Sequence, residues 1–266
     1  MVYNRFQERS ARRQAQRTFA SSHADVLLDG RREPAAEPRR SAPQPGVALA
    51  EKIDYVIDVE LPSPQARAVI WESWLAVERR FSRRVQLAGT DQPTARSLRA
   101  ALQLISREGV VSDAELLEFR SMVETMAAQL GASARAPEMR AALDGARELD
   151  RTCAEADIQV ALHVVGIGAG PAEFPDQPFQ ATPREDGVTL TLDVARTAEP
   201  SRTYEAMVRA GRQLAQARGG RLVDDQGHDL DERALAAIGR ELESVRQSLA
   251  ACGIEAGSPL ALRVFS

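Results

Sequence analysis

The feature that most constrains the fold of this chain is a recurring alternation of apolar and polar residues, each time followed by a helical pattern. Apolar side chains occupy every second position within 55–61, 160–164 and 188–194. This is the period of a strand with one buried face. Amphipathic helices must cover that face, so the intervening residues of each strand must point away from the helices.

The first half of the chain predicts a strand, a helix, two strands and two further helices. Their expected positions are 55–61, 66–81, 84–87, 98–105, 112–130 and 137–155. Pro62-Ser63-Pro64 is expected to end the first strand. Ser112 and Glu115 have the spacing of a capping box at the start of a helix. Gly131 supplies the left-handed residue that ends that helix.

The second half repeats this order in shortened form. It predicts two strands, a helix, a short strand and a final helix, at 158–165, 187–195, 201–218, 221–223 and from a cap at Asp229 onward. Phe119-x-x-Met-Val and Tyr204-x-x-Met-Val match between the halves, which indicates a degenerate tandem duplication. The Gly/Pro-rich bridge 167–186 replaces a helix and a strand of the first half, so we expect the second copy to lack an element.

The N-terminal region differs from the folded body. Residues 1–17 carry five arginines and one acidic residue, whereas the whole chain has a net charge of −4. These arginines are Arg5, Arg9, Arg12, Arg13 and Arg17. Residues 30–47 are rich in Pro, Gly, Ser, Arg and Glu, the composition of a disordered linker. A charge run of this kind is either a solvated tail or a membrane-proximal segment.

The sequence shows no constellation typical of catalysis. The three histidines, His23, His163 and His228, stand apart from one another and from any nucleophile motif. Ile167-Gly-Ala-Gly170 lacks the third glycine and the helix of a dinucleotide loop. We therefore predict no enzyme activity, no cofactor and no small-molecule substrate.

Acidic and thiol side chains have structural explanations. The four aspartates at 224, 225, 229 and 231 lack the spacing of a calcium loop, so a turn followed by a helix cap is the favoured interpretation over a cation site. Cys153 and Cys252 fall near the ends of predicted helices and are expected to be buried thiols that form neither a disulfide nor a metal site.

Short motifs in the C-terminal part point to a family. They are GVTLTLDV at 187–194, MV at 207–208, GGRLVDD at 219–225, LAAI at 235–238 and GSPLALRVFS at 257–266. Together they resemble the C-terminal FtsZ-binding domain of ZipA-type cell-division proteins. Residues 51–156 resemble the region that precedes this domain in longer ZipA-like proteins. YNRFQER at 3–9 resembles the basic stretch that follows their N-terminal membrane helix.

The resemblance implies an α+β fold of the split β-α-β type, with an antiparallel sheet, helices on one face and the other face open. It also implies a division into a basic juxtamembrane segment with a linker (1–50), a first repeat (51–156) and a C-terminal domain with a shortened middle (157–266). The open face would bind the C-terminal peptide of FtsZ through Gln159, Ala161, His163, Thr189 and Thr191, aided by Phe174 and Phe179 if these two do more than pin a loop.

The same resemblance implies a place and a role. The chain would be a non-catalytic adaptor in division septum assembly at the cytoplasmic face of the inner membrane, with its arginines on anionic lipids. No apolar run is long enough to span a bilayer, so an anchor helix would have to lie upstream of Met1. Two alternatives remain: a paralogue that has lost FtsZ binding and self-associates, and a nucleic-acid binder. The latter would need aromatic platforms and a basic surround, so we predict no nucleic-acid partner.

Overall fold

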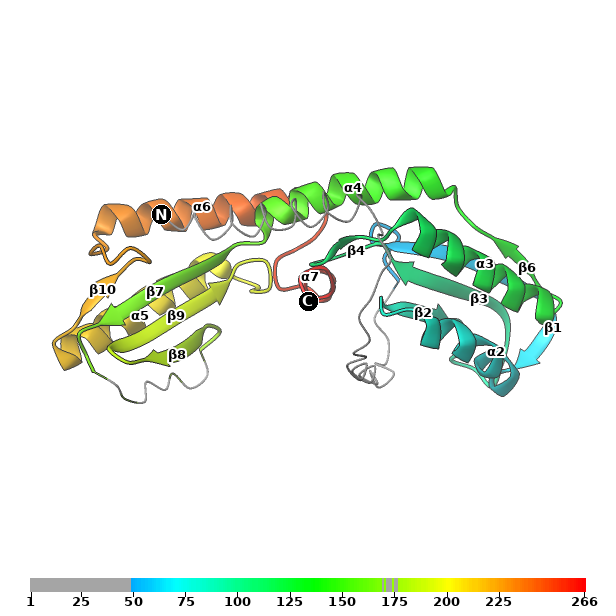
Figure 1. Cartoon of the computed structure of the whole chain (residues 1–266), viewed down its shortest axis with the longest axis horizontal. Coiled ribbons are helices and arrows are strands. Elements are labelled where there is room, and N and C mark those ends of the chain that lie inside the picture. Colours follow the sequence, from blue (N-terminus) through cyan, green and yellow to red (C-terminus); the bar gives the residue numbers. More distant parts are fainter. Residues whose placement is uncertain (1–48, 169, 171–173, 175–176) are drawn as a thin grey trace, which may run out of the picture. The chain divides into compact units, whose positions relative to one another are not determined.

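The computed structural model describes residues 49–168, 170, 174 and 177–266 (Figure 1). These residues form two compact units, which divide between Arg151 and Thr152. The five N-terminal arginines lie outside the described residues.

The first unit contains the nine elements β1 (Asp54–Ala66), α2 (Arg67–Arg80), β2 (Val85–Ala88), β3 (Thr94–Gln103), β4 (Ile105–Ser106), β5 (Gly109–Val110), α3 (Asp113–Gln129), β6 (Ser133–Arg135) and α4 (Met139–Ala156), the last of which continues past the division. Its main sheet has the order β2-β3-β1-β6, and every pairing in it is antiparallel. The short strands β4 and β5 form a separate antiparallel pair.

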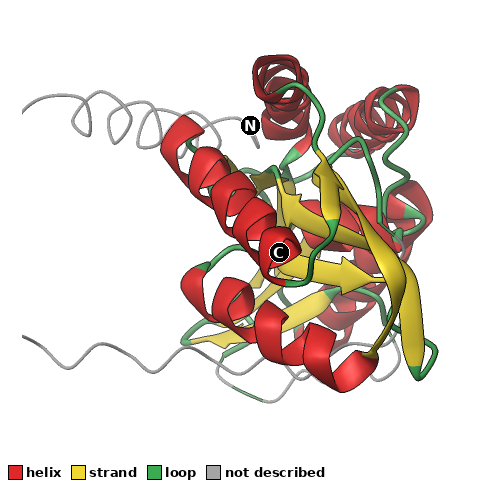
Figure 2. Ribbon diagram, turned by 90° about the vertical axis from the view of Figure 1, so that its right-hand side faces the viewer, coloured by secondary structure: helices red, strands yellow, loops and turns green. Residues whose placement is uncertain are grey.

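The predicted apolar face of β1 is confirmed. Tyr55, Ile57 and Val59 are buried and stand opposite Leu102, Ala100 and Leu98 of β3. Helix α2 contacts β1 and β2, and α3 contacts β1, β3 and β6. In Figure 2, where the first unit faces the viewer, two helices lie on one side of its strands. The core is therefore the layer between these helices and the sheet.

The start of α3 confirms one half of the predicted capping box. The Glu115 backbone N–H donates to Ser112 Oγ at 3.1 Å. The Glu115 carboxylate instead lies 3.5 Å from Arg83 Nε, in a partly buried ion pair. Gly131 follows the helix with φ +64°, the predicted left-handed stop.

The prediction that Pro62-Ser63-Pro64 ends the first strand is wrong. β1 continues to Ala66, and its register with β3 shifts between Glu60 and Gln65. Prolines 62 and 64 fall within this irregular stretch, where the missing N–H groups interrupt no regular ladder.

The second unit contains the elements β7 (Gln159–Val165), β8 (Gln180–Arg184), β9 (Gly187–Asp193), α5 (Pro200–Arg218), β10 (Arg221–Val223), α6 (Glu232–Ala251) and α7 (Pro259–Val264). Its sheet has the order β10-β7-β9-β8 and is antiparallel throughout. The predicted α+β class with antiparallel sheets is confirmed.

The two sheets share one topology. Reversing the order of the second sheet aligns β8 with β2, β9 with β3, β7 with β1, and β10 with β6. The helices follow at equivalent points, since α3 and α5 each precede the short edge strand, and α4 and α6 each come after it. This is the arrangement that a tandem duplication produces.

The prediction that bridge 167–186 holds no strand is wrong. β8 lies within it and pairs with β9 over five residues. Its sequence, Gln-Ala-Thr-Pro-Arg, contains Pro183, which an edge strand tolerates because the N–H that proline lacks is not needed on the outer side of the strand. Among the described residues between β7 and β8 there is no helix that would correspond to α2.

Helix α5 lies on the apolar side of the second sheet, which it contacts at β7, β9 and β10. The approach is close at Gly211, where an added Cβ would come within 2.8 Å of Leu222 Cδ1 and 3.4 Å of Leu190 Cδ1. Helix α6 packs against α5. Val164, Leu190 and Leu222 thus form the face that the helices cover.

Tyr204 of α5 is buried, and within the described structure its hydroxyl has no hydrogen-bond partner. Burial raises the pKa of Tyr204 to about 12, and the charge of Arg212 only partly opposes this. The folded state thus holds the neutral phenol, and the stability this provides is complete below about pH 10 and lost as the pH rises toward about 12.

We therefore predict that Tyr204→Phe stabilises the second unit by about 1 kcal/mol at neutral pH, because an unsatisfied buried hydroxyl is removed. The variant should also lose less stability than the wild type between about pH 10 and pH 12. The matched control is Tyr55→Phe, which removes a 2.7 Å hydrogen bond to the Pro137 carbonyl and should destabilise. Urea unfolding at neutral pH, at about pH 10 and at about pH 12 measures these differences in the free energy of unfolding. A destabilised Tyr204→Phe would contradict this account.

Two details of the C-terminal part differ from the sequence predictions. Asp231, not Asp229, caps α6, because its Oδ1 accepts from the Ala234 N–H at 2.7 Å. Asp229 instead pairs with Arg221 at 3.1 Å. Helix α7 was not predicted; Ser258 caps it, and Pro259 is its first residue.

Neither Cys153 nor Cys252 is in a disulfide bond in the described structure. Cys153 is buried in α4, as predicted, whereas Cys252 is half-buried at the C-cap of α6. Among the helices that the structure describes, none is both long and apolar enough to cross a membrane.

Candidate functional site

The strand register of the second unit brings the predicted face residues together. Ala161 stands opposite Thr191, and His163 stands opposite Thr189. Gln159 lies two residues from Ala161 on the same face, opposite Asp193. β8 extends this face with Gln180, Thr182 and Arg184. We call this set the polar face; it lies on the side of the sheet that does not carry α5.

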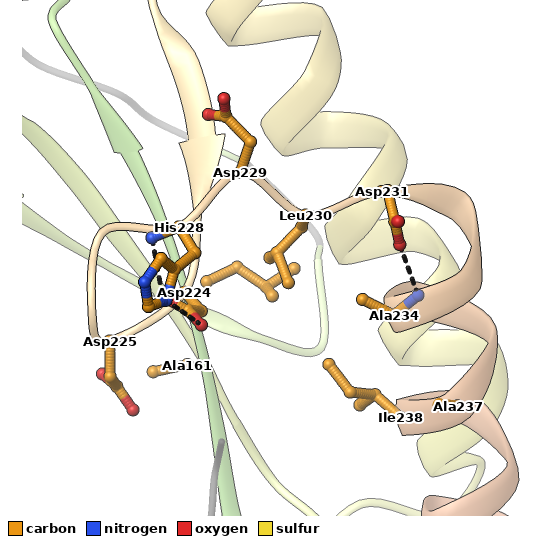
Figure 3. A pocket seen from close by; sticks show the side chains of 11 residues that line it. Ala161, Asp224, Asp225, His228, Asp229, Leu230, Asp231, Ala234, Ala237 and Ile238 are labelled. Atoms are coloured by element: carbon orange, nitrogen blue, oxygen red, sulfur yellow. Dashed lines mark hydrogen bonds and ion pairs between the residues drawn. The ribbon is translucent and has the colours of Figure 1, made fainter.

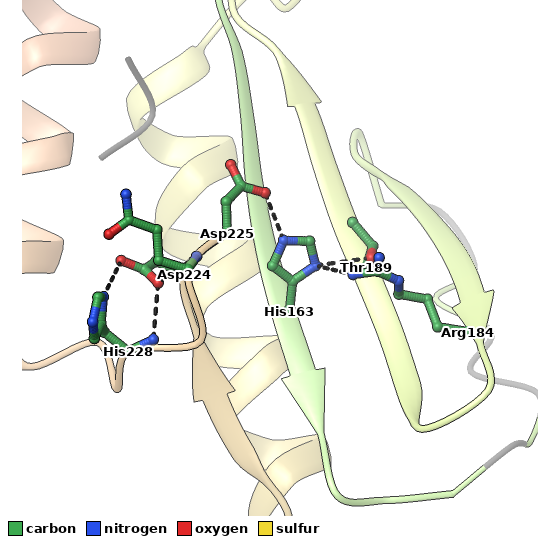
Figure 4. Close-up of polar contacts among 7 residues, drawn as sticks. His163, Arg184, Thr189, Asp224, Asp225 and His228 are labelled. Carbon is green, nitrogen blue, oxygen red and sulfur yellow. Dashed lines mark hydrogen bonds and ion pairs between the residues drawn. The ribbon is translucent and has the colours of Figure 1, made fainter. Parts of the chain in front are cut away.

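His163 is the centre of the polar face. Its ring is almost enclosed, at 8% exposure for the residue. Nε2 lies 2.8 Å from Asp225 Oδ1, and Nδ1 lies 2.9 Å from Thr189 Oγ1. The side chain of Arg184 reaches the same nitrogen, with Nη1 3.2 Å from Nδ1 (Figure 4). Four side chains from β7, β8, β9 and the turn after β10 thus form one network.

The hydrogen bonds of this network indicate which ring nitrogen of His163 carries the hydrogen. A guanidinium has only donors, so Nδ1 must be the acceptor that faces Arg184. The hydrogen of the neutral ring then lies on Nε2 and is donated to the Asp225 carboxylate. Of these four residues, His163 and Thr189 were predicted to lie on this face, whereas Arg184 and Asp225 were not.

The contacts run from the Asp225 carboxylate to the His163 imidazole and on to the Thr189 hydroxyl. The catalytic triad of a hydrolase has the same three kinds of group in the same order. Two observations oppose that use. Arg184 already occupies the Nδ1 lone pair that would have to receive the hydroxyl proton. Thr189 also lies inside a regular strand, not on an exposed turn. We therefore interpret the network as one that holds these four side chains in place, and not as one that transfers a proton.

The two phenylalanines of the bridge contact each other. Their ring centroids are 5.5 Å apart and the rings are tilted by 57°. Phe179 is buried and Phe174 is half-buried. An aromatic pair of this kind stabilises the approach to β8, the edge strand of the polar face.

The turn between β10 and α6 shapes the neighbouring surface. It borders a cavity of about 380 Å³, which Ala161 and the N-terminal half of α6 also line (Figure 3). Burial opposes ionisation of Asp224, but N–H donation from His228 and Gln226 outweighs it and lowers the pKa of this carboxyl. Asp224 thus serves the turn, as predicted, whereas the helix cap is Asp231 and not the predicted Asp229. In the part of the chain that the structure describes, no cluster of three or more His, Cys, Asp or Glu residues is arranged to hold a metal ion.

Comparison with known families identifies the region that holds this face. Residues 171–241 match the family model described as ZipA, C-terminal FtsZ-binding domain. This match confirms the ZipA-type resemblance. No curated protein matches the chain closely enough to be reported beside it.

The ZipA-type match begins in the bridge and extends through β8, β9, α5 and β10 into the first part of α6. It therefore includes Arg184, Thr189 and Asp225. β7, with His163, precedes the matched residues but is hydrogen-bonded to β9 along its whole length. The first unit lies outside the match, and its likeness to the second rests on the shared topology.

Proposed function

We propose that this chain is a non-catalytic adaptor of the bacterial division machinery, and that the polar face of its second unit docks the C-terminal tail of FtsZ. The ZipA-type match over 171–241 carries this proposal. The open side of the sheet supports it, because α5 covers only the opposite side. A flexible peptide can lie across strands that present their side chains outward.

The polar face offers a docked peptide more hydrogen bonds than apolar area. Thr189, Thr191 and Ala161 are half-buried, so they line a shallow surface instead of a deep groove. The paired Phe174 and Phe179 supply apolar area beside β8. We therefore expect a weaker and more salt-sensitive complex than an apolar groove would make.

The corresponding face of the first unit has fewer polar groups available to bind a peptide. Arg99 lies there, and its guanidinium pairs with Asp58 at 3.3 Å and with Glu51 at 2.7 Å. Ser97 donates to Glu60 on the same face at 2.9 Å. Because these groups already pair with each other, we assign the tail to the second unit.

The test is the affinity of a fluorescently labelled FtsZ tail peptide for the full chain, measured by anisotropy. Thr191→Glu places a longer, negatively charged side chain in the middle of the face and should weaken binding at least about tenfold by steric exclusion and by repulsion of carboxylates. Thr125→Glu, on the exposed surface of α3, is the matched control and should leave the affinity unchanged. Equal affinity of the two variants would reject the assigned face.

The alternative is a ZipA-like paralogue that has lost FtsZ binding and self-associates. The same titration separates the two: absence of saturable binding to the wild type, together with a dimer in sedimentation, favours the alternative.

The membrane link is also a proposal. Arg5, Arg9, Arg12, Arg13 and Arg17 would each gain about 1 kcal/mol near an anionic surface. Co-sedimentation with anionic vesicles, compared with neutral ones, tests this attraction. Loss of binding when all five are changed to glutamine would support it, and equal binding to both kinds of vesicle would reject it.

A further inference from the structure

We propose that Arg184 is the anion-recognition residue of the polar face, where a carboxylate side chain of the docked peptide binds while neutral His163 holds the guanidinium in place. This inference rests on the proposed peptide docking and adds its chemistry. It names an acidic residue in the partner as the determinant of recognition.

The position of Arg184 supports this role. It is the last residue of edge strand β8, yet its side chain extends over the sheet face toward His163 of the far strand β7 (Figure 4). The guanidinium thereby lies over the middle of the sheet instead of at its rim. A cation in that place meets any peptide that crosses the face.

The charge of Arg184 is not compensated. Among the described residues, none of the carboxylates pairs with it, whereas Arg202, Arg221 and Arg246 of the same unit each pair with an acid. Within the described structure its guanidinium instead contacts Nδ1 of the His163 imidazole at 3.2 Å. A guanidinium has five N–H donors in a planar fork, so most remain for a ligand.

His163 acts as a positioning residue for this cation. Three elements face its ring with polar or charged groups: Arg184 from β8, Thr189 from β9 and Asp225 from the turn after β10. The other ionisable groups of that turn, Asp224 and His228, pair with each other. A side chain without an acceptor at the place of Nδ1 would leave this contact of Arg184 unmade.

The docked anion is best matched by a peptide carboxylate. The neighbouring face positions, Thr182, Thr189 and Thr191, are hydroxyl groups at strand spacing. Such positions can satisfy the polar groups of an extended chain while Arg184 forms a bidentate pair with Asp or Glu. Lysine would lack the planar fork needed to hold the imidazole and the carboxylate together.

The experiment is a double-mutant cycle with the full chain. Two labelled peptides are used: the FtsZ C-terminal tail, and the same tail with every Asp and Glu changed to Asn and Gln. The wild-type protein should bind the acidic peptide about tenfold or more tightly than the amide version. Arg184→Met should abolish this preference, while Arg209→Met, on the exposed side of α5, should retain it. Retention of the preference in Arg184→Met would overturn the inference.

The positioning role has its own readout. His163→Phe removes the acceptor of Arg184 and should reduce the preference for the acidic peptide, whereas His163→Gln, whose amide oxygen can accept from a guanidinium, should retain part of that preference. Equal preferences in these two variants would reject the role of His163.

If neither peptide binds the wild type, the proposed docking of FtsZ fails, and the carboxylate site is judged separately. NMR titration with the α-amide of N-acetyl-aspartate, against the α-amide of N-acetyl-asparagine as control, follows the Arg184 side-chain Nε–H signal. A shift with the first compound alone supports the inference, and equal or absent shifts overturn it.

Discussion

Gly187→Ala is expected to cost the second unit at least about 3 kcal/mol of unfolding free energy, and many molecules of the variant should be unfolded at 37 °C. An added Cβ at this position would come within 1.8 Å of the Val164 carbonyl oxygen and 2.9 Å of its carbon. These are backbone atoms of β7, so no side-chain rotation relieves the overlap. β7 and β9 would have to separate at the point where their ladder begins.

The matched control is Gly239→Ala in α6. An added Cβ there meets no atom within 4 Å. Alanine has a higher helix propensity than glycine by about 1 kcal/mol, so this variant should be neutral or more stable. Hydrogen exchange of the β9 amides, or chemical denaturation, measures both variants. Wild-type stability of Gly187→Ala would show that the two strands do not approach as closely as the structure has them.

Trp74→Ala should destabilise the first unit by about 3–5 kcal/mol, the usual cost of removing a buried aromatic side chain. Trp74 is 1% exposed and is among the largest fully buried side chains of the chain. It belongs to α2, which packs on β1 and β2. Loss of the indole would leave a cavity in the core beside Ile70 and Val77, the other buried residues of this helix.

The chain contains its own control for this substitution. Trp71 lies three residues earlier in α2 and is only half-buried, so Trp71→Ala should cost roughly 1 kcal/mol or less. Urea unfolding followed by far-ultraviolet circular dichroism compares the two variants. Equal costs for the two tryptophans would contradict the packing described for α2.

Elements with strong periodicity were predictable from the sequence. Alternation placed β1, β7 and β9, and three- and four-residue steps placed the long helices. Two of the edge strands, β6 and β8, were harder, because β6 is short and β8 consists of Gln180, Ala181, Thr182, Pro183 and Arg184, none of them a large apolar residue. Such strands form because a neighbouring strand provides backbone hydrogen-bond partners. The local sequence does not show that this neighbour is present.

The residues of the candidate site likewise divide into those that local sequence predicts and those that it does not. His163 and Thr189 could be assigned to one face because each lies in an alternating strand. Arg184 and Asp225 could not, since the first is in an unrecognised strand and the second is in a turn that local hydrogen bonds already explain. Their meeting depends on the register between β8, β9 and β7 and on where the turn after β10 folds. The choice between Asp229 and Asp231 as helix cap likewise depended on the Asp229 ion pair with Arg221.

The central claim is that the polar face of the second unit receives the FtsZ tail. Its most direct test is an NMR titration of the ¹⁵N-labelled full chain with the unlabelled tail peptide. The account predicts that the largest amide shifts fall on β7, β8 and β9, with the signals of His163, Arg184 and Thr191 among them. Shifts confined to the first unit or to the outer surfaces of α5 and α6, or no shift at saturating peptide, would contradict it.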